Sequence, residues 1–205
     1  MKLNTNSNAY IIIYSAILVV IVAFLLAFVY QALKPMQDAN VALDVKKQIL
    51  YSLNIRDLDG AEAEAKYAEV VKEEKDLDGQ KVYDCEVNGE KIAVASLKGM
   101  GLWGGISGYI AIKGDGTVYG AYFNHESETA GLGAEIKDSR AWQELFKGKT
   151  IYDAQGNAVL KVLKKSEVKN PASEVDAVTG ATLTSVGVSD MLQEGFSKYQ
   201  KYLKK

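Results

Sequence analysis

The chain has 205 residues, of which 48% are hydrophobic, enough for one membrane segment and one compact domain. Its 24 basic and 26 acidic residues nearly balance, and no basic patch is interleaved with aromatic residues, which argues against nucleic-acid binding. Cys85 and His125 are the only residues of their types. The sequence therefore offers no intrachain disulfide, no Cys/His zinc site and no Cys–His catalytic pair.

The first predicted element is an uncharged run over residues 9–30. As a helix rising about 1.5 Å per residue, this run would cross the roughly 30 Å hydrocarbon core of a bilayer. Tyr10, Tyr14 and Tyr30 lie toward its ends, where aromatic rings prefer the membrane interface. A cleaved signal peptide is the alternative, but its apolar region normally has about 7–15 residues and ends at small residues. We therefore expect a retained transmembrane helix at 9–30, whose orientation the flanking charges do not decide.

Residues 31–75 are expected to form a helical connector. Pro35 suits the first turn of a second helix, along which apolar residues recur every four positions from Val41 to Leu53. Residues 61–74 are acidic and rich in alanine, and this pattern predicts a surface helix.

Residues 76–205 are expected to form one domain of the α+β class, built mainly from antiparallel strands. Period-two alternation on both sides of Asn88-Gly89 and of Asp115-Gly116 predicts two hairpins. Hairpins followed by segregated helices are typical of that class. The expected elements are strands at 82–87 and 92–97, strands at 106–112 and 117–123, a short helix at 139–146, a third hairpin at 150–162 and a last helix from about Val186.

Residues 99–104 match the G-x-G-x-x-G pattern of dinucleotide-binding folds. That pattern works only where the turn opens a helix inside a parallel βαβ unit. Because the following segment predicts a strand, we reject the dinucleotide interpretation. A glycine-dense loop remains, at which the backbone can approach a flat ring closely. Trp103 in this loop either faces such a ring or is buried in the core.

A second loop, residues 126–133, follows the strand that ends at Phe123. Its carboxylates, Glu126 and Glu128, are too close in sequence to form the pair of a glycosidase, which meets across a cleft. The loop either packs against one face of a ring, with its polar groups bonded to the ring's edge, or is a solvated turn.

The third loop, residues 179–185, reads TGATLTS and combines hydroxyl side chains with small ones. Its thin backbone would let an alcohol enter the active site of another enzyme. It also precedes a predicted helix, whose N-terminal N–H groups and dipole favour a phosphate. The loop thus suits a phosphate ester. The alternative is that Thr182, Thr184 or Ser185 is merely the N-cap of the last helix.

Together, the three loops resemble those of the FMN-binding domain family, in the same order. TGATLTS is similar to the signature [ST]-G-A-[ST]-x-[ST], whose fourth residue receives FMN through a phosphoester bond. Residues 101–103 and 128–133 resemble the flavin-facing loops, and residues 4–10, the apolar run and residues 40–50 also match. The resemblance is closest to the C subunits of the sodium-translocating NADH:quinone oxidoreductases. The G subunit of Rnf complexes shares the attachment motif, but less of the N-terminal pattern.

The resemblance implies that FMN is attached covalently to Thr182, with its phosphate beside the N-terminus of the last helix. Lys164 is a weaker candidate for a phosphate partner, with Lys161 and Lys165 as competitors. Ala130 stands where the family often has proline, which leaves that loop less rigid. The other residues implied at the cofactor are Trp103, Glu128, Thr129 and Leu132 along the isoalloxazine ring, and Gly133, Gly180, Ala181, Leu183 and Thr184.

For the whole chain, the resemblance implies a single-pass subunit of the bacterial inner membrane. Residues 1–8 would be cytoplasmic, and a periplasmic FMN-binding domain would hold a mainly antiparallel sheet flanked by helices. Such a subunit passes single electrons between an iron–sulfur centre and a flavin in a partner subunit. The complete complex oxidises NADH, reduces quinone and pumps sodium, which this chain alone would not do.

The implied partners are the other subunits of that complex, a flavin transferase for maturation and the lipid bilayer. Two alternatives stay open. One is an Rnf-type G subunit of a ferredoxin:NAD oxidoreductase. The other is a membrane-anchored scaffold without a cofactor, in which TGATLTS serves only as a helix cap.

Overall fold

The computed structural model describes residues 7–77 and 79–203 and divides into two compact units, Met1–Asp44 and Val45–Lys205. The expected cytoplasmic segment 1–8 lies almost wholly outside the described residues. Helix α1 (Asn8–Ser52) supplies the described part of the first unit and the beginning of the second. Its most apolar stretch has a mean hydropathy of 3.1 and no buried residues. This helix is long and apolar enough to cross a membrane, as the sequence predicted.

Pro35 does not begin a second helix, so that prediction was wrong. It lies inside α1, which continues without interruption to Ser52. A proline inside a helix removes one backbone hydrogen bond, which flanking turns can tolerate when their residues favour the helix. The residues on both sides are mostly good helix formers, and Lys34 and Asp38 form an i,i+4 ion pair at 3.4 Å across the proline.

The second unit is built on a five-stranded antiparallel sheet in the order β1-β2-β3-β4-β5. Both strong hairpin predictions are confirmed. Asn88 and Gly89 have φ of 54° and 80°, the left-handed pair that a tight two-residue turn requires. The strands are β1 (Val71–Leu77), β2 (Gln80–Val87), β3 (Glu90–Met100), β4 (Gly105–Lys113) and β5 (Val118–His125).

The acidic surface helix is shorter than predicted. Helix α2 (Gly60–Val70) begins at a capping box between Asp59 and Glu62. The prediction that it continues to residue 74 was wrong, because Val71 pairs with Cys85 and starts β1. Pairing with β2 therefore overrides the helical preference of the lysines and glutamates that follow Val71.

The third predicted hairpin is replaced by another arrangement. Residues 150–162 form no paired strands of a hairpin: Tyr152 and Ala158 make an isolated bridge, and Thr150 bridges to Thr117. Their last residues instead enter β6 (Lys161–Leu163), which pairs in parallel with β7 (Glu174–Asp176). The predicted helix at 139–146 is realised as α4 (Arg140–Glu144), whose N-cap is Ser139. A short helix, α3 (Glu135–Asp138), precedes it.

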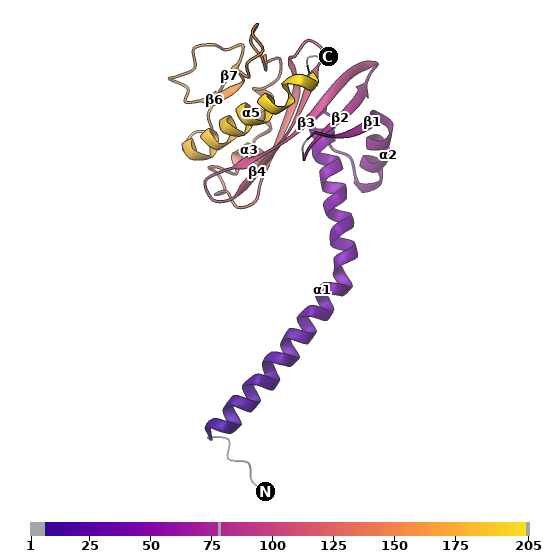
Figure 1. Cartoon of the computed structure of the whole chain (residues 1–205), viewed down its shortest axis with the longest axis vertical. Coiled ribbons are helices and arrows are strands. Elements are labelled where there is room, and N and C mark those ends of the chain that lie inside the picture. The colour runs from indigo at the N-terminus through magenta and orange to yellow at the C-terminus, as the bar shows by residue number, and fades with distance from the viewer. Residues whose placement is uncertain (1–6, 78, 204–205) are drawn as a thin grey trace. The chain divides into compact units, whose positions relative to one another are not determined.

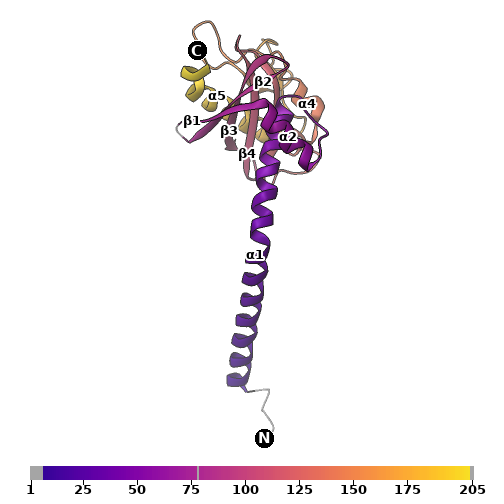
Figure 2. The same cartoon turned by 90° about the vertical axis from the view of Figure 1, so that its right-hand side faces the viewer.

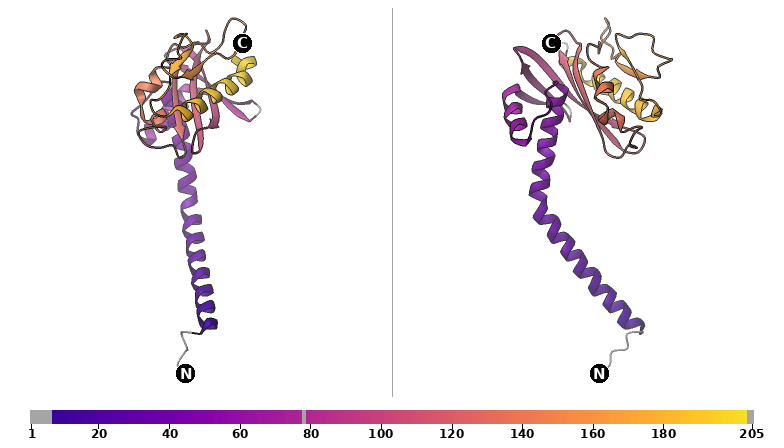
Figure 3. Two further views of the ribbon diagram at one scale, coloured as in Figure 1. Left: turned by 90° about the vertical axis from the view of Figure 1, so that its left-hand side faces the viewer. Right: turned by 180° about the vertical axis from the view of Figure 1, so that it is seen from behind.

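The last helix, α5 (Thr182–Leu203), and the end of α1 lie on opposite faces of the sheet (Figure 1). Neighbouring residues of β5 direct their side chains to these two opposite faces in turn. Tyr122 contacts Tyr51 of α1, with ring centroids 5.2 Å apart, whereas Phe123 packs against Trp142 of α4 at 5.3 Å. Figure 2 shows α2 beside the end of α1 on the first face, and Figure 3 shows β6, β7 and the short helices with α5 on the second.

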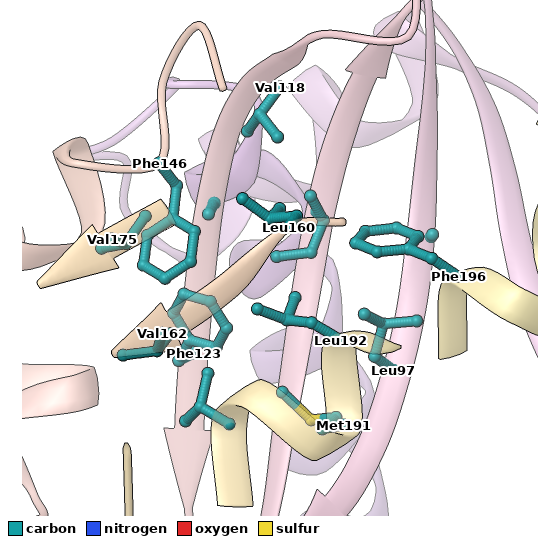
Figure 4. Close-up of a cluster of buried hydrophobic side chains, with 14 of the residues drawn as sticks. Leu97, Val118, Phe123, Phe146, Leu160, Val162, Val175, Met191, Leu192 and Phe196 are labelled. Carbon is teal, nitrogen blue, oxygen red and sulfur yellow. The ribbon is translucent and has the colours of Figure 1, made fainter. Parts of the chain in front are cut away.

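The apolar face of α5 fills the main core. Met191, Leu192 and Phe196 point toward Leu97 and Phe123 of the sheet, while residues of β6 and β7 close the cluster from the side (Figure 4). Burial of Phe196 and Leu192 is complete. Each such side chain contributes about 1.5–3 kcal/mol by leaving water. This packing holds the first turn of α5, and with it the hydroxyl-rich segment, at a set place on the domain.

Candidate functional site

The structure brings the three loops that the sequence singled out together on one side of the domain. Residues 101–104 connect β3 to β4, and residues 126–134 follow β5. Residues 179–185 lead from β7 into α5. The antiparallel pairing of Met100 with Gly105 also agrees with rejecting a dinucleotide-binding βαβ unit.

Glu128 is the residue through which these loops meet. Its side chain is buried, with only 7% of the residue exposed. One carboxylate oxygen, Oε1, accepts the backbone N–H of Trp103 at 2.9 Å. The other, Oε2, accepts the hydroxyl of Thr184 at 2.6 Å. Glu128 therefore forms direct hydrogen bonds to partners 25 and 56 positions away in the sequence.

The surroundings of Glu128 favour its ionised form. Burial on its own raises the pKa of this carboxyl group. The hydrogen bonds from Thr184 and from the backbone N–H groups of Trp103 and Leu102 lower the pKa by more, so that it lies below its ordinary value. The backbone N–H of Glu128 also donates to Nδ1 of His125 at 3.1 Å. That bond requires Nδ1 of His125 to be unprotonated.

Two glycines provide the space that the carboxylate occupies. A Cβ atom built on Gly101 would lie 2.5 Å from Oε1 of Glu128. A Cβ atom built on Gly133 would lie 2.4 Å from Oε2 and 2.6 Å from the hydroxyl oxygen of Thr184. All three distances are too short for real carbon–oxygen contacts. The glycines of the first two loops thus admit the buried carboxylate between them.

Further bonds hold the first two loops to each other. The hydroxyl of Ser127 donates to the backbone oxygen of Trp103 at 2.9 Å, and Glu126 accepts the N–H of Gly105 at 3.1 Å. In the second loop, the backbone oxygen of Thr129 accepts the N–H of Leu132 at 3.1 Å. Hydrogen bonds therefore hold this turn to the first loop, with Glu128 and Gly133 buried and its other residues exposed. Its packing against a ring stays a prediction.

The hydroxyl-rich segment divides its side chains between the surface and the interior. Thr182 is exposed, whereas Thr184 and Ser185 are buried. Residues of an α-helix turn by about 100° each, so positions two apart face nearly opposite directions. Thr184 bonds to Glu128, and the oxygen of Ser185 accepts the N–H of Val178 at 3.1 Å. Thr182, on the opposite side of this turn from Thr184, is exposed to solvent.

The last helix begins at Thr182 and not at the predicted Val186, because residues 182–185 already have helical geometry. Ala181, which precedes the helix, is buried and has no side-chain oxygen. The alternative that one of the hydroxyls caps this helix is therefore not supported. Thr182 instead stands in the first helical turn, where backbone N–H groups lack helical partners.

Exposed apolar side chains gather around this segment. In the described part of Val45–Lys205, every exposed large apolar side chain except Leu145 belongs to the three loops or lies beside them. Trp103 is 66% exposed, so the alternative that it belongs to the core was wrong. Leu132 packs close to Gly180, whose φ is +79°, and thereby joins the second loop to the third. These side chains, called the apolar patch below, are Met100, Leu102, Trp103, Leu132, Leu183 and Val186.

The position of Lys164 relative to the three loops is less well defined by contacts. It is exposed and directly follows β6. Because β6 and β7 are parallel, it leaves the sheet at the same end from which the chain continues toward Thr182. Of its two competitors, Lys165 is exposed and Lys161 forms an ion pair with Glu174 at 3.4 Å. Lys164 therefore stays a predicted phosphate partner on grounds of position alone.

The sequence alone did not indicate the parts played by Met100, Val186 and His125. Met100 and Val186 extend the apolar patch, although each occupies an ordinary strand or helix position in the sequence. Their exposure depends on the packing of α5 against the end of β3, where the backbone oxygen of Met100 approaches Gly187. A helical wheel beginning at Thr182 would have placed Val186 on the same outward face.

The site's residues fit a flavin nucleotide. A flat apolar ring would cover the apolar patch, and a phosphate would find free N–H groups at the start of α5. The Thr182 hydroxyl lies in that same first turn.

Comparison with known proteins agrees with this geometry. Residues 101–197 match the family model described as FMN-binding domain. The chain is 39% identical over 134 residues to the C subunit of the Na(+)-translocating NADH-quinone reductase of Pseudomonas aeruginosa, a match that covers 60% of this chain and 51% of that relative. The corresponding protein of Neisseria meningitidis is 37% identical over 154 residues, covering 73% and 54%. The chain thus spans about half the length of the curated relatives that it matches.

Among solved structures, the C subunit of the Na(+)-translocating NADH-quinone reductase from Parabacteroides distasonis superposes with a TM-score of 0.77 at 34% identity. The match covers 84% of this chain and 98% of that one. NqrC of Shewanella oneidensis, with a TM-score of 0.66 and 23% identity, shares the fold. The chain therefore belongs to the family of C subunits of the Na(+)-translocating NADH-quinone reductases, with an FMN-binding domain that spans residues 101–197.

Proposed function

We propose that this chain is a membrane-anchored electron carrier that holds FMN in phosphoester linkage to the hydroxyl of Thr182. The observation that carries the proposal is the orientation of the signature segment. Thr184 and Ser185 are bonded inside the domain, while Thr182 is exposed in the first turn of α5.

The first turn of α5 suits the phosphate of the cofactor. Its N–H groups have no helical partners, and the positive end of the helix dipole favours a negative charge. A phosphoester on Thr182 would place its charged oxygens at this turn. Lys164 is the proposed additional cation, since it leaves β6 at the same end of the sheet.

The apolar patch suits the ring. Trp103, Leu132 and Leu183 are exposed on the three loops, and covering them would remove apolar surface from water. Thr129, which is also exposed, offers a hydroxyl to the edge of such a ring. Glu128 is not proposed as a direct ring contact, because both of its carboxylate oxygens are bonded within the protein.

Attachment requires an activated donor and a second enzyme. An ester between an alcohol and FMN forms readily only when the phosphate enters as part of an anhydride, as in a flavin dinucleotide. The Thr182 oxygen forms the new bond to phosphorus, the anhydride bond breaks, and the nucleotide monophosphate leaves. The hydroxyl proton goes to a base of the transferase. The exposed Thr182 gives such an enzyme access.

The role in a larger assembly follows from the family. The relatives carry the name of one subunit of a Na(+)-translocating NADH-quinone reductase, and bound FMN supplies one-electron redox chemistry. We propose that the chain relays electrons between an iron–sulfur centre and a flavin in partner subunits. The apolar helix α1 would anchor it in the inner membrane, with the domain of Val45–Lys205 on the periplasmic side.

Replacing the acceptor hydroxyl tests the proposal. The full chain is co-expressed with a flavin transferase, and the denatured protein is examined for a fluorescent flavin band. Thr182→Ala is expected to abolish the band, and Thr182→Ser to retain it, because serine keeps the hydroxyl. Both variants should unfold like the wild type, since the side chain of Thr182 is exposed.

A flavin band that survives in Thr182→Ala would refute attachment at this residue. A wild-type chain that takes up no flavin would favour the scaffold alternative instead. Electron transfer linked to ferredoxin and not to NADH in the assembled complex would favour an Rnf-type subunit.

A further inference from the structure

Glu128 shows a feature that the proposed attachment at Thr182 does not explain. A buried carboxylate is costly unless hydrogen bonds satisfy it, and this one is satisfied by a backbone N–H and a hydroxyl from two other segments. Because its oxygens are engaged inside the protein, it has a different task from the exposed residues around it.

We propose that Glu128 is a positioning residue for flavin attachment: its carboxylate clamps the first turn of α5 to the β3–β4 loop and thereby presents Thr182 to the flavin donor. This inference rests on the proposed function. It assigns to Glu128 and Thr184 one shared structural element, the Glu128–Thr184 clamp, which is already present in the chain without flavin.

The helix geometry links the clamp to the acceptor. Thr184 is two residues beyond Thr182, so the two side chains point about 200° apart around the helix axis. A hydrogen bond of 2.6 Å from Thr184 to a buried oxygen sets the rotation of the first turn. That rotation directs Thr182 outward. Without it, the end of the helix can fray, as free helix ends do, and the acceptor hydroxyl loses its fixed direction.

The same carboxylate also sets the ring-binding side. Its other oxygen holds the N–H of Trp103, while the indole ring of Trp103 is 66% exposed. A single side chain thus fixes the distance between the acceptor threonine and the apolar patch. Bonds to a charged acceptor are stronger than those between neutral groups, which explains why a carboxylate serves here better than an amide.

The space around the Glu128 carboxylate supports the view that the surrounding loops are shaped to hold it. Gly101 and Gly133 both lack the Cβ atom that would collide with it, each from a different loop. The hydrogen bond from the N–H of Glu128 to His125 fixes the backbone of the clamp from a third direction. The β3–β4 loop, the loop of Glu128 itself and the first turn of α5 therefore each leave room for this ionised group or bond to it.

The test measures the rate of flavin incorporation into the full chain, with a purified flavin transferase and flavin adenine dinucleotide as the FMN donor. Thr184→Val keeps the shape of the side chain and removes its hydroxyl, whereas Thr184→Ser keeps the hydroxyl. We expect Thr184→Val and Glu128→Gln each to slow incorporation by about tenfold, equivalent to about 1.4 kcal/mol. Thr184→Ser should restore a rate near that of the wild type.

The double variant Glu128→Gln/Thr184→Val is expected to be about as slow as either single variant, because both act on the same contact: valine removes its hydroxyl donor and glutamine removes its charged acceptor. A control for general destabilisation is Ile110→Val, in the fully buried centre of β4. That change typically costs about 0.5–1.5 kcal/mol of stability, and it should leave the rate of incorporation unchanged.

A second readout does not depend on flavin. Loss of the clamp should speed hydrogen exchange of the Trp103 backbone amide in Glu128→Gln and Thr184→Val, but not in Ile110→Val. Incorporation at the wild-type rate in Thr184→Val, or equal slowing in Ile110→Val, would overturn the positioning role. If the wild type itself takes up no flavin, the proposed function fails together with this inference. The exchange data then still show whether the clamp forms.

Discussion

Individual side chains of one short segment carry different tasks. Among the hydroxyls of residues 179–185, Thr184 and Ser185 bond inside the domain and Thr182 faces solvent. Thr184 is two positions beyond Thr182 and therefore faces nearly the opposite way around α5, whereas Ser185 is held inward by its bond to the N–H of Val178. A hydroxyl-rich motif therefore does not need several reactive groups. Two of its members can fix the direction of a third.

The ionised state of Glu128 should appear in the pH dependence of stability. The pKa of Glu128 is lowered in the folded protein, so its contribution is fully present above the pKa of an unfolded glutamate, about 4.3. It is lost as pH falls through the lowered pKa. Glu128→Gln should thus destabilise the domain by about 1–3 kcal/mol at pH 7, and this difference should shrink below about pH 4.

Urea unfolding of the wild type and of Glu128→Gln at several pH values measures that difference. Other carboxylates with a lowered pKa, such as Asp115 and Glu174, affect both proteins alike and cancel in the comparison. A difference that stays constant from pH 7 down to pH 3 would contradict an ionised role for Glu128.

At the scale of secondary-structure elements, the close packing of α5 against β3 holds the site. Small residues make this approach possible. A Cβ atom built on Gly187 would lie 2.2 Å from the backbone oxygen of Met100, and one built on Gly195 would lie 2.5 Å from Leu97. The first contact is with backbone, which cannot move aside as a side chain can. The register of α5 on the sheet thus depends on Gly187.

Gly187→Ala should therefore destabilise the domain, even though alanine favours a helix over glycine by about 0.5–1 kcal/mol. Overpacking of this kind typically costs about 1–3 kcal/mol, so we expect a net loss of stability in chemical denaturation. Asp190→Ala, at an exposed position of the same helix, is the matched control and should change stability by less than about 0.5 kcal/mol. Equal stability of Gly187→Ala and the wild type would show that the helix can shift away from β3.

At the scale of the whole molecule, the chain combines one unit whose surface suits a lipid bilayer with one whose surface suits water. The described part of Met1–Asp44 exposes nearly all of its large apolar side chains, whereas Val45–Lys205 has its own core. Exposed apolar residues over a span of this length are stable in a lipid bilayer and not in water. Membrane association should therefore depend on the first unit alone.

A chain that begins at Val45 should remain in the soluble fraction after cell lysis, while the full chain should sediment with membranes and require detergent. The truncation keeps Ile49, Leu50 and Leu53, which are buried in the domain. Intact mass of the membrane-bound chain checks the signal-peptide alternative, since cleavage would remove the residues before about position 30. Sedimentation of the truncated chain with membranes would place the anchor elsewhere.

Local chemistry in the sequence was sufficient for several features. Asn88-Gly89 predicts its hairpin because the two left-handed residues are adjacent, and the apolar run predicts its helix from length and composition. The order of three short motifs was sufficient to indicate the family. Local sequence chemistry could not predict features that depend on residues far away in the chain. Residues 71–77 form a strand only because β2 lies beside them, and Pro35 stays helical because its flanking turns support it.

The role of Thr182 as acceptor was a prediction from the sequence and stays a proposal, but its outward direction could come only from the tertiary structure. That direction depends on Glu128, which reaches Trp103 and Thr184 across 25 and 56 positions of the chain. No periodicity or local motif predicts such a bond, because the burial of Glu128 and its hydrogen-bond partners depend on how the three loops pack together. The sequence determined which alcohol is available, and the folded domain decided which way it faces.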